Sequence, residues 1–371
     1  MLNGKQTIVV RGLFYAVALY FLFLLVASQI PRLGKSVTRH GAHYGDLYDL
    51  SKVIMFRSKI PDEFPWSDLE TFEEVKNSDI ILFGDSFIAF NDELLGYRLK
   101  HETGRSTSVT VYRVLKSQGG NNPLVMLSEL QYAPKEKSFL VWEKVERLIA
   151  REIPEMTSAP KEDIVSGEEA REEETSLLQN IDKHIEAIYL HTDKIEYTFL
   201  NFRGTRWLVS CLSTLRFLLF HELPDLTPKY SLNPDMLFSY AEVDAHSLEF
   251  SDEDIIVMAD VIMEIRETVK REYNIELIFL PIPDKYTIYG DLAGAGPYNN
   301  LIPRLETELE RRGVPCVNIL PDYTAFREKN DINDLIYYPG DTHWNPTGVN
   351  IAAEAVLRYL YEQYPEDFER E

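Results

Sequence analysis

Cysteine is scarce in this chain, since its 371 residues include only Cys211 and Cys316. Two cysteines cannot build a disulfide scaffold or a structural zinc site rich in cysteine ligands. One disulfide is compatible with the count, but two buried thiols are the simpler expectation. Stability must therefore come from a hydrophobic core, and the 45% hydrophobic and 12% aromatic content is sufficient for one.

Positive charge is also in deficit. Lys and Arg number 38 against 60 Asp and Glu, which gives a net charge of −22. Such a surface repels phosphate backbones, so nucleic acid is not an expected partner. The same charge keeps a folded domain away from anionic lipid unless a hydrophobic anchor holds it there.

Long apolar runs are missing except at the amino terminus, where residues 8–30 contain an uncharged stretch over 12–27. About 20 apolar residues cross a bilayer as a helix, whereas the apolar core of a signal peptide is shorter, at about 7 to 15. We therefore expect residues 1–30 to be an uncleaved membrane anchor. The small residues before position 29 leave cleavage after Ser28 as the alternative.

From residue 76 onward, short apolar runs alternate with longer segments of helical periodicity. This alternation is typical of an α/β fold with a parallel sheet. It predicts one large domain over 76–371, preceded by a linker and lead-in over 31–75. The expected strands are 80–83, 109–115, 139–142, 275–280 and 314–319, and the expected helices include 252–272, 301–312 and 349–361.

Residues 151–250 interrupt the alternation with an acidic, charge-rich run followed by helical stretches. We expect this segment to be an insertion that caps or flanks the sheet. Its apolar stretch, 207–220, is too short and too interrupted by polar residues for a membrane span. A membrane-facing amphipathic helix is the alternative interpretation of that stretch.

Ser86 follows the first apolar run directly, in the sequence Gly84-Asp85-Ser86-Phe87. Parallel sheets place active sites at the carboxyl ends of their strands. A tight glycine turn there would expose the hydroxyl and aim the Ser86 N–H at a developing oxyanion. Taken alone, however, the sequence Gly-Asp-Ser is more often an ordinary helix N-cap.

A second polar block, residues 341–345 (Asp-Thr-His-Trp-Asn), lies near the carboxyl terminus. Asn345 before Pro346 predicts a helix N-cap, which places Asp341 and His343 in the loop before that helix. A histidine accepts a serine proton only when its ring is held in the correct tautomer, and an acid two positions away can hold it. No cysteine or dense histidine cluster accompanies the block, so no metal is expected.

Together these blocks resemble the SGNH (GDSL) hydrolase superfamily and are most similar to its alginate O-acetyltransferase branch, the AlgX/AlgJ-type SGNH domains. Four segments carry the likeness, which spans about 78–150 and 270–362: 84–87, 139–147, 281–289 and 341–345. In the alginate proteins the Asp-x-His block precedes the serine block, whereas here it follows, so the order is rotated. The resemblance implies a three-layer, flavodoxin-like α/β fold with a parallel sheet of about five strands.

The resemblance also implies roles for individual residues. Ser86 matches the nucleophile, His343 the general base and Asp341 the acid that orients His343. The residues assigned to oxyanion or substrate binding are Gly120, Asn121, Arg147, Lys285, Tyr289 and Trp344. A structural ion pair is an equal expectation for Arg147, as is an ordinary loop position for Lys285 and Tyr289.

These assignments predict a membrane-anchored, extracytoplasmic enzyme that moves an acyl group, in the simplest case acetyl, onto or off a cell-surface polysaccharide. It would need no cofactor, and a membrane protein that supplies the acyl group is a candidate partner. A plain esterase would use the same three residues with water as the acceptor. A non-enzymatic carbohydrate-binding or assembly protein of SGNH-like fold is the alternative. It predicts that Ser86, His343 and Asp341 do not lie within hydrogen-bond distance of one another.

The anchor interpretation makes a prediction about the mature protein. Because an uncleaved anchor crosses the bilayer, the protein should stay in the membrane fraction after an alkaline wash, and its amino-terminal peptide should be detectable by mass spectrometry. Recovery in the soluble fraction of a chain that starts at Gln29 would instead establish cleavage after Ser28.

Overall fold

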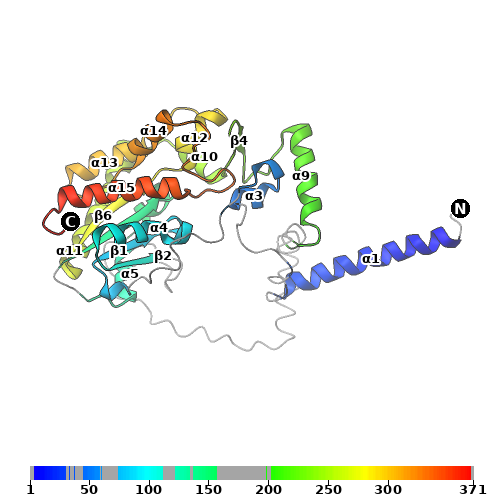
Figure 1. Ribbon diagram of the computed structural model, residues 1–371, viewed down its shortest axis with the longest axis horizontal. Coiled ribbons are helices and arrows are strands. Elements are labelled where there is room, and N and C mark those ends of the chain that lie inside the picture. Colours follow the sequence, from blue (N-terminus) through cyan, green and yellow to red (C-terminus); the bar gives the residue numbers. More distant parts are fainter. Residues whose placement is uncertain are drawn as a thin grey trace. The chain divides into compact units, whose positions relative to one another are not determined.

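The computed structural model describes residues 4–30, 33, 37, 45–58, 60, 74–111, 122–133, 137–156, 198 and 202–368 (Figure 1). The chain divides into two compact units. The smaller unit contains α1 (Gly4–Gln29) and α9 (Arg206–Phe220). The larger unit contains the other described α-helices and all the described strands.

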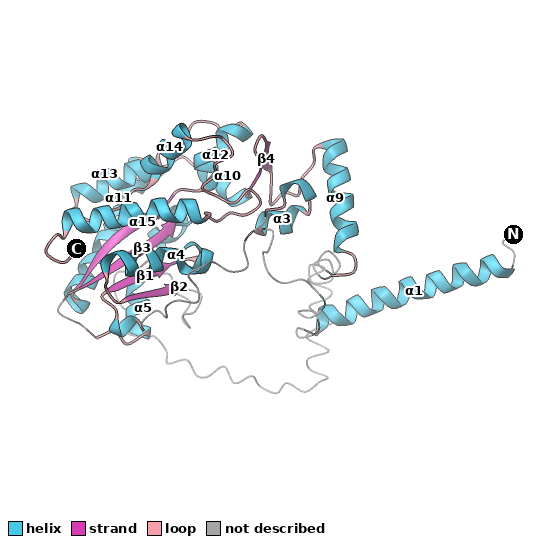
Figure 2. Ribbon diagram, in the orientation of Figure 1, coloured by secondary structure: helices cyan, strands magenta, loops and turns pink. Residues whose placement is uncertain are grey.

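A four-stranded parallel sheet forms the centre of the larger unit (Figure 2). In spatial order its strands are β2 (Thr107–Val111), β1 (Ile80–Gly84), β3 (Ser138–Val145) and β6 (Ile275–Ile282). Ile80 of β1 lies beside Thr107 of β2 and Phe139 of β3. Parallel neighbours need crossover connections, which helices provide. The predicted α/β fold with a parallel sheet is confirmed.

The prediction of a fifth strand over 314–319 is wrong, because this segment is not a strand. It makes one parallel bridge, Cys316 to Phe279 of β6, in which Phe279 N donates to Pro315 O and Val317 N donates to Phe279 O, both at 2.9 Å. The next bonds of the ladder in the two directions would need N–H groups at positions 315 and 281, which are both prolines and lack one. The bridge still occupies the fifth place of the flavodoxin-like order 2-1-3-4-5.

Side chains of the strands alternate between two cores, one on each face of the sheet. Ile80 and Leu82 of β1 belong to one core, and Ile81 and Phe83 to the other. The first core is covered by α4 (Ser86–Thr103), α12 (Lys285–Tyr289), α14 (Leu320–Lys329) and α15 (Pro346–Gln363). The second is covered by α5 (Pro123–Glu129), α6 (Glu146–Glu152), α11 (Asp252–Tyr273) and α13 (Leu301–Arg311). The result is the expected three-layer arrangement.

Several shorter elements complete the larger unit. They are α3 (Asp46–Ser51), α10 (Tyr240–Ser247) and an antiparallel hairpin of β4 (Lys229–Leu232) and β5 (Asp235–Phe238). Of the expected insertion, residues 157–197 lie outside the described residues, as does most of the lead-in over 31–75. The extent of both segments stays a prediction.

Helix α1 contains an apolar segment, Val10–Gln29, which is long and apolar enough to cross a membrane and is largely exposed. No other helix of the described residues has these properties. A membrane anchor and a signal sequence both fit this segment. The two cysteines are free. Cys211 is exposed on α9, so the expectation that both thiols are buried is wrong for Cys211.

Gly84 makes the turn between β1 and α4 compact enough for a buried side chain to pack on it. A Cβ atom at this position would lie 2.2 Å from Glu143 Oε2 and 2.9 Å from Glu143 Cβ. Glu143 is completely buried and its Oε2 accepts a hydrogen bond of 2.9 Å from Asp85 N. Glycine at position 84 therefore allows the glutamate to hold the turn before Ser86.

Gly84→Ala should lower the free energy of unfolding by about 1–3 kcal/mol, because the new methyl group collides with a buried side chain. Urea unfolding followed by circular dichroism measures the change. Gly296→Ala is the matched control, since a Cβ at that position meets nothing within 4 Å. An equal effect of the two substitutions would show that contact with Glu143 is not what requires glycine at position 84.

Candidate active site

Ser86 is the first residue of α4 and follows the carboxyl end of β1. The side chain of Asp85 caps the helix by accepting a 2.8 Å hydrogen bond from Phe87 N. Ser86 is partly exposed, whereas Asp85 and Phe87 on either side of it are buried. The turn therefore presents one hydroxyl at the edge of the sheet, beside the amino terminus of a helix whose first N–H groups have no partner within the helix.

His343 and Asp341 meet this hydroxyl from the opposite end of the chain. His343 Nε2 lies 2.8 Å from Ser86 Oγ, and His343 Nδ1 lies 2.6 Å from Asp341 Oδ1. The ring of His343 also packs against Phe87, with 4.8 Å between ring centroids. The structure thus brings the three predicted residues into one hydrogen-bonded line, with the histidine between the serine and the acid.

The carboxylate of Asp341 is fully buried. Burial acts to raise its pKa, but hydrogen bonds from the ring and backbone N–H of His343 and the charge of that ring outweigh it, so the pKa is lowered. Asp341 Oδ1 also accepts from His343 N at 2.9 Å. An ionised Asp341 with two bonds to one residue fixes the His343 tautomer that donates from Nδ1 and leaves Nε2 to accept a proton.

Asp46, which no sequence motif indicated, binds the loop that carries Asp341 through three hydrogen bonds. Its Oδ1 accepts from Thr342 N at 2.9 Å, its Oδ2 accepts from Thr342 Oγ1 at 2.7 Å, and its own N–H donates to Asp341 Oδ2 at 2.8 Å. Gly45, with φ of +99°, has its backbone so close to Gly340 that a Cβ would lie 2.0 Å from the Gly340 oxygen. No local sequence signal marks Asp46, because its partners lie almost 300 residues away.

Burial, followed by the charge of Asp341, raises the pKa of Asp46 to about 6. Asp46, Asp341 and His343 each offer an atom within 4.8 Å of the others, the spacing of a metal-binding group. However, both Asp46 oxygens and both Asp341 oxygens accept the hydrogen bonds given above, from Thr342, His343 and the Asp46 backbone. These bonds explain the grouping, so we assign it to positioning of the loop.

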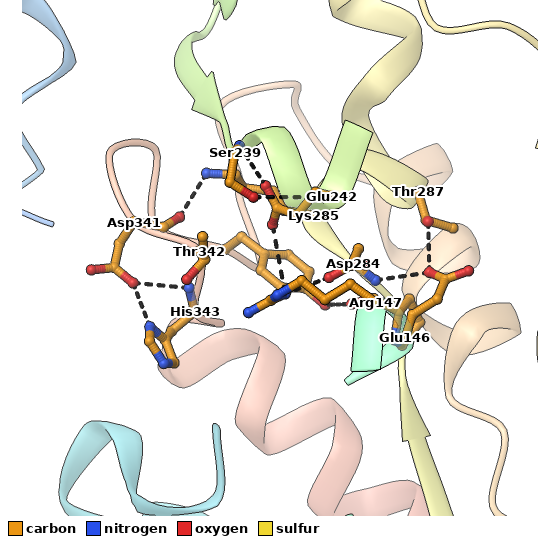
Figure 3. Close-up of polar contacts among 12 residues, drawn as sticks. Glu146, Arg147, Ser239, Glu242, Asp284, Lys285, Thr287, Asp341, Thr342 and His343 are labelled. Atoms are coloured by element: carbon orange, nitrogen blue, oxygen red, sulfur yellow. Dashed lines mark hydrogen bonds and ion pairs between the residues drawn. The ribbon is translucent and has the colours of Figure 1, made fainter. Parts of the chain in front are cut away.

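Lys285 is buried beneath the same loop and binds its backbone. Its ammonium group is fully buried and donates to Asp341 O at 2.6 Å (Figure 3). It makes longer bonds to Pro339 O at 3.3 Å and Tyr338 O at 3.4 Å. Burial lowers the pKa of Lys285, and nearby carboxylates only partly offset this. The arrangement favours a positioning role for Lys285 over direct contact with a substrate.

Arg147 lies beside the three residues but is already paired. It binds Asp284 and lies 4.0 Å from Glu242 (Figure 3). Its guanidinium lies over the Phe87 ring, 5.4 Å from the ring centroid. These contacts agree with the alternative that Arg147 forms a structural ion pair. Arg147 remains 16% exposed, so its role in binding substrate stays a prediction.

Four further predicted residues are either buried or outside the described part of the chain. Tyr289 is buried and its hydroxyl accepts from Ile336 N at 3.1 Å. Trp344 is buried and donates from Nε1 to Phe87 O at 3.0 Å, which ties the histidine loop to α4. Burial favours positioning roles for both. Gly120 and Asn121 lie outside the described residues.

A family model described as "SGNH hydrolase-like domain, acetyltransferase AlgX" matches residues 233–370. The match confirms the predicted resemblance to an SGNH-like, AlgX-type domain over that part of the chain. It contains Asp341 and His343, whereas Ser86 lies before it. No curated protein and no solved structure matches the chain.

Asp46→Asn tests the raised pKa of Asp46. Between about pH 4 and pH 6 the folded protein holds a proton on Asp46 that the unfolded chain has released, so this group makes stability fall as pH rises through that window. The substitution removes the titration and keeps the shape, so the variant should gain about 1–2 kcal/mol on the wild type between pH 4 and pH 6.5.

Urea unfolding at several pH values measures this difference. Asp235→Asn, which removes an exposed carboxylate, is the control variant. A stability difference between wild type and Asp46→Asn that stays constant with pH would contradict the prediction.

Proposed function

We propose that the chain is a membrane-anchored, SGNH-type O-acyltransferase or esterase that moves an acetyl group onto or off a cell-surface polysaccharide. The observation that carries the proposal is the line of Ser86, His343 and Asp341, with contacts of 2.8 Å and 2.6 Å. The acetyltransferase-type SGNH domain matched by residues 233–370 supports the choice of acyl group and substrate class.

The mechanism follows from these contacts. His343 Nε2 accepts the Ser86 proton as Oγ attacks the acyl carbonyl, and the His343–Asp341 hydrogen bond stabilises the imidazolium that forms. Collapse of the tetrahedral intermediate breaks the bond to the donor alcohol, which takes the proton from His343 and leaves an acetyl ester on Ser86. The N–H of Ser86 at the start of α4 is the nearest candidate to stabilise the oxyanion.

The second half of the reaction repeats these steps in reverse with a new hydroxyl. His343 removes its proton, the hydroxyl oxygen attacks the acetyl ester, and Ser86 Oγ regains the proton as the leaving group. A sugar hydroxyl as acceptor gives transfer, and water gives hydrolysis. Extracytoplasmic placement by α1 would put the site beside surface polysaccharide and beside a membrane protein that supplies acetyl groups.

A carbohydrate-binding or assembly protein without catalysis is the second candidate function. That function places no demand on the distances between Ser86, His343 and Asp341. Their alignment in one hydrogen-bonded line, with Asp341 buried and ionised, is needed only for proton transfer and therefore favours the enzyme.

Ser86→Ala should lower turnover of a chromogenic acetyl ester by about three orders of magnitude or more, because it removes the attacking oxygen. His343→Ala should cost a similar factor, and the double variant little more, since the two residues act as one unit. Ser247→Ala, at an exposed helix end, is the control and should keep full activity. Treatment with a chelator should also leave the wild type active.

Trapping the acyl-enzyme completes the test. Brief reaction of wild-type protein with the ester should place one acetyl group on the peptide that contains Ser86, as measured by mass spectrometry. Full activity of folded Ser86→Ala, or loss of wild-type activity on chelation, would refute the serine mechanism. Partition of the acetyl group between water and an added oligosaccharide then distinguishes esterase from transferase.

A further inference from the structure

Helix α9 exposes one continuous apolar side. Its large exposed side chains include Trp207, Leu208, Leu212, Leu215, Leu218 and Leu219, each between 45% and 67% exposed. Positions 208, 212, 215 and 219 recur at steps of four, three and four residues, and 207 and 218 lie next to them on the same side of the helix. A contiguous apolar surface of this kind on a folded protein marks a site of contact with another apolar phase or partner.

The opposite side of α9 already packs against its own unit. Arg206, Ser210 and Phe217 are buried, and Thr214 Oγ1 accepts a 2.9 Å hydrogen bond from Ile54 N. These residues also recur at three- and four-residue steps, which places them across the helix from the leucines. Among the described residues, the contacts that hold α9 are therefore on the side away from the leucines.

The residues at the beginning of α9 contact the apolar helix α1. Tyr20 Oη donates to Thr205 Oγ1 at 3.3 Å, and the Phe202 ring packs against Tyr20 and Phe23 with centroids 5.7 Å and 5.9 Å apart. Tyr20 lies nine residues before the end of α1, which is about 14 Å along a helix. If Val10–Gln29 spans the bilayer, the turn that starts α9 lies at the depth of lipid.

The local charge also differs from that of the rest of the chain. Residues 202–221 contain three arginines and no Asp or Glu, although the whole protein carries a net charge of −22. Of these arginines, Arg216 pairs with Glu222 at 2.7 Å. A helix with arginine, tryptophan and leucine and without acids is typical of segments that lie in the interface of an anionic bilayer.

We propose that α9 is a second membrane-contacting element, with its apolar side in the lipid acyl layer beside α1. The occupant of this surface is the bilayer itself. The inference rests on the anchor assigned to α1 in the proposed function and is independent of the catalytic role of Ser86. The smaller unit then contacts the membrane through two helices, α1 and α9, instead of through α1 alone.

Tryptophan fluorescence of the full-length protein in vesicles provides the test. Of the four tryptophans, Trp207 is exposed on α9, whereas Trp142 and Trp344 are fully buried. The wild-type spectrum minus that of Trp207→Phe isolates Trp207. In vesicles of phosphatidylcholine and phosphatidylglycerol, lipids brominated on their acyl chains should quench this signal strongly, and iodide in the water should have little effect.

Leu215→Glu/Leu219→Glu should abolish the quenching of Trp207 by brominated lipid, because two charges now lie on the apolar side. Leu248→Glu, at an exposed leucine of the larger unit, is the control and should leave it unchanged. Quenching by iodide alone, a failure of the wild type to bind vesicles, or efficient crosslinking of two copies through Cys211 would each overturn the proposal. None of these measurements uses an ester, so they do not depend on catalysis.

Discussion

A buried negative charge on Asp341 is the constraint on which the candidate site depends. A carboxylate without solvent is stable only when hydrogen bonds replace the lost water. Here the N–H of Asp46 binds one oxygen, and the backbone and ring of His343 bind the other. Satisfying Asp341 therefore sets the orientation of the His343 ring and also requires Asp46, the first residue of α3, to lie against the loop.

The sheet positions the other half of the site through a second buried carboxylate. Burial and the charge of Asp85 raise the pKa of Glu143, whose Oε2 nevertheless accepts from Asp85 N. This contact fixes the turn after β1, and the indole of Trp344 joins that turn to the histidine loop through Phe87 O. Ser86 and His343 are thus held by buried networks that are linked by the Trp344 bond and by the Ser86–His343 bond, an arrangement suited to proton transfer without reorganisation.

Two cations next to the site also support its geometry. Lys285 and Arg147 are cations that burial disfavours; the acids beside Arg147 outweigh the effect of burial on its pKa, whereas the acids near Lys285 offset it only in part. Lys285 supports the loop at the backbone of Asp341, and Arg147 stacks over the Phe87 ring that packs on His343. Their substitution would therefore act on the site through geometry, in addition to any contact with a polysaccharide.

The sequence by itself determined the α/β class, four of the strands, and the pairing of Ser86 with Asp341 and His343, because apolar periodicity and short motifs are local signals. Tertiary structure decided the rest. Asp46 has no local signal, since its partners follow almost 300 residues later. The fifth strand stopped at a single bridge because Pro315 and Pro281 have no N–H to continue the ladder in either direction. Lys285, Tyr289 and Trp344 became buried supports because packing, which no short motif encodes, determines which polar groups face the interior.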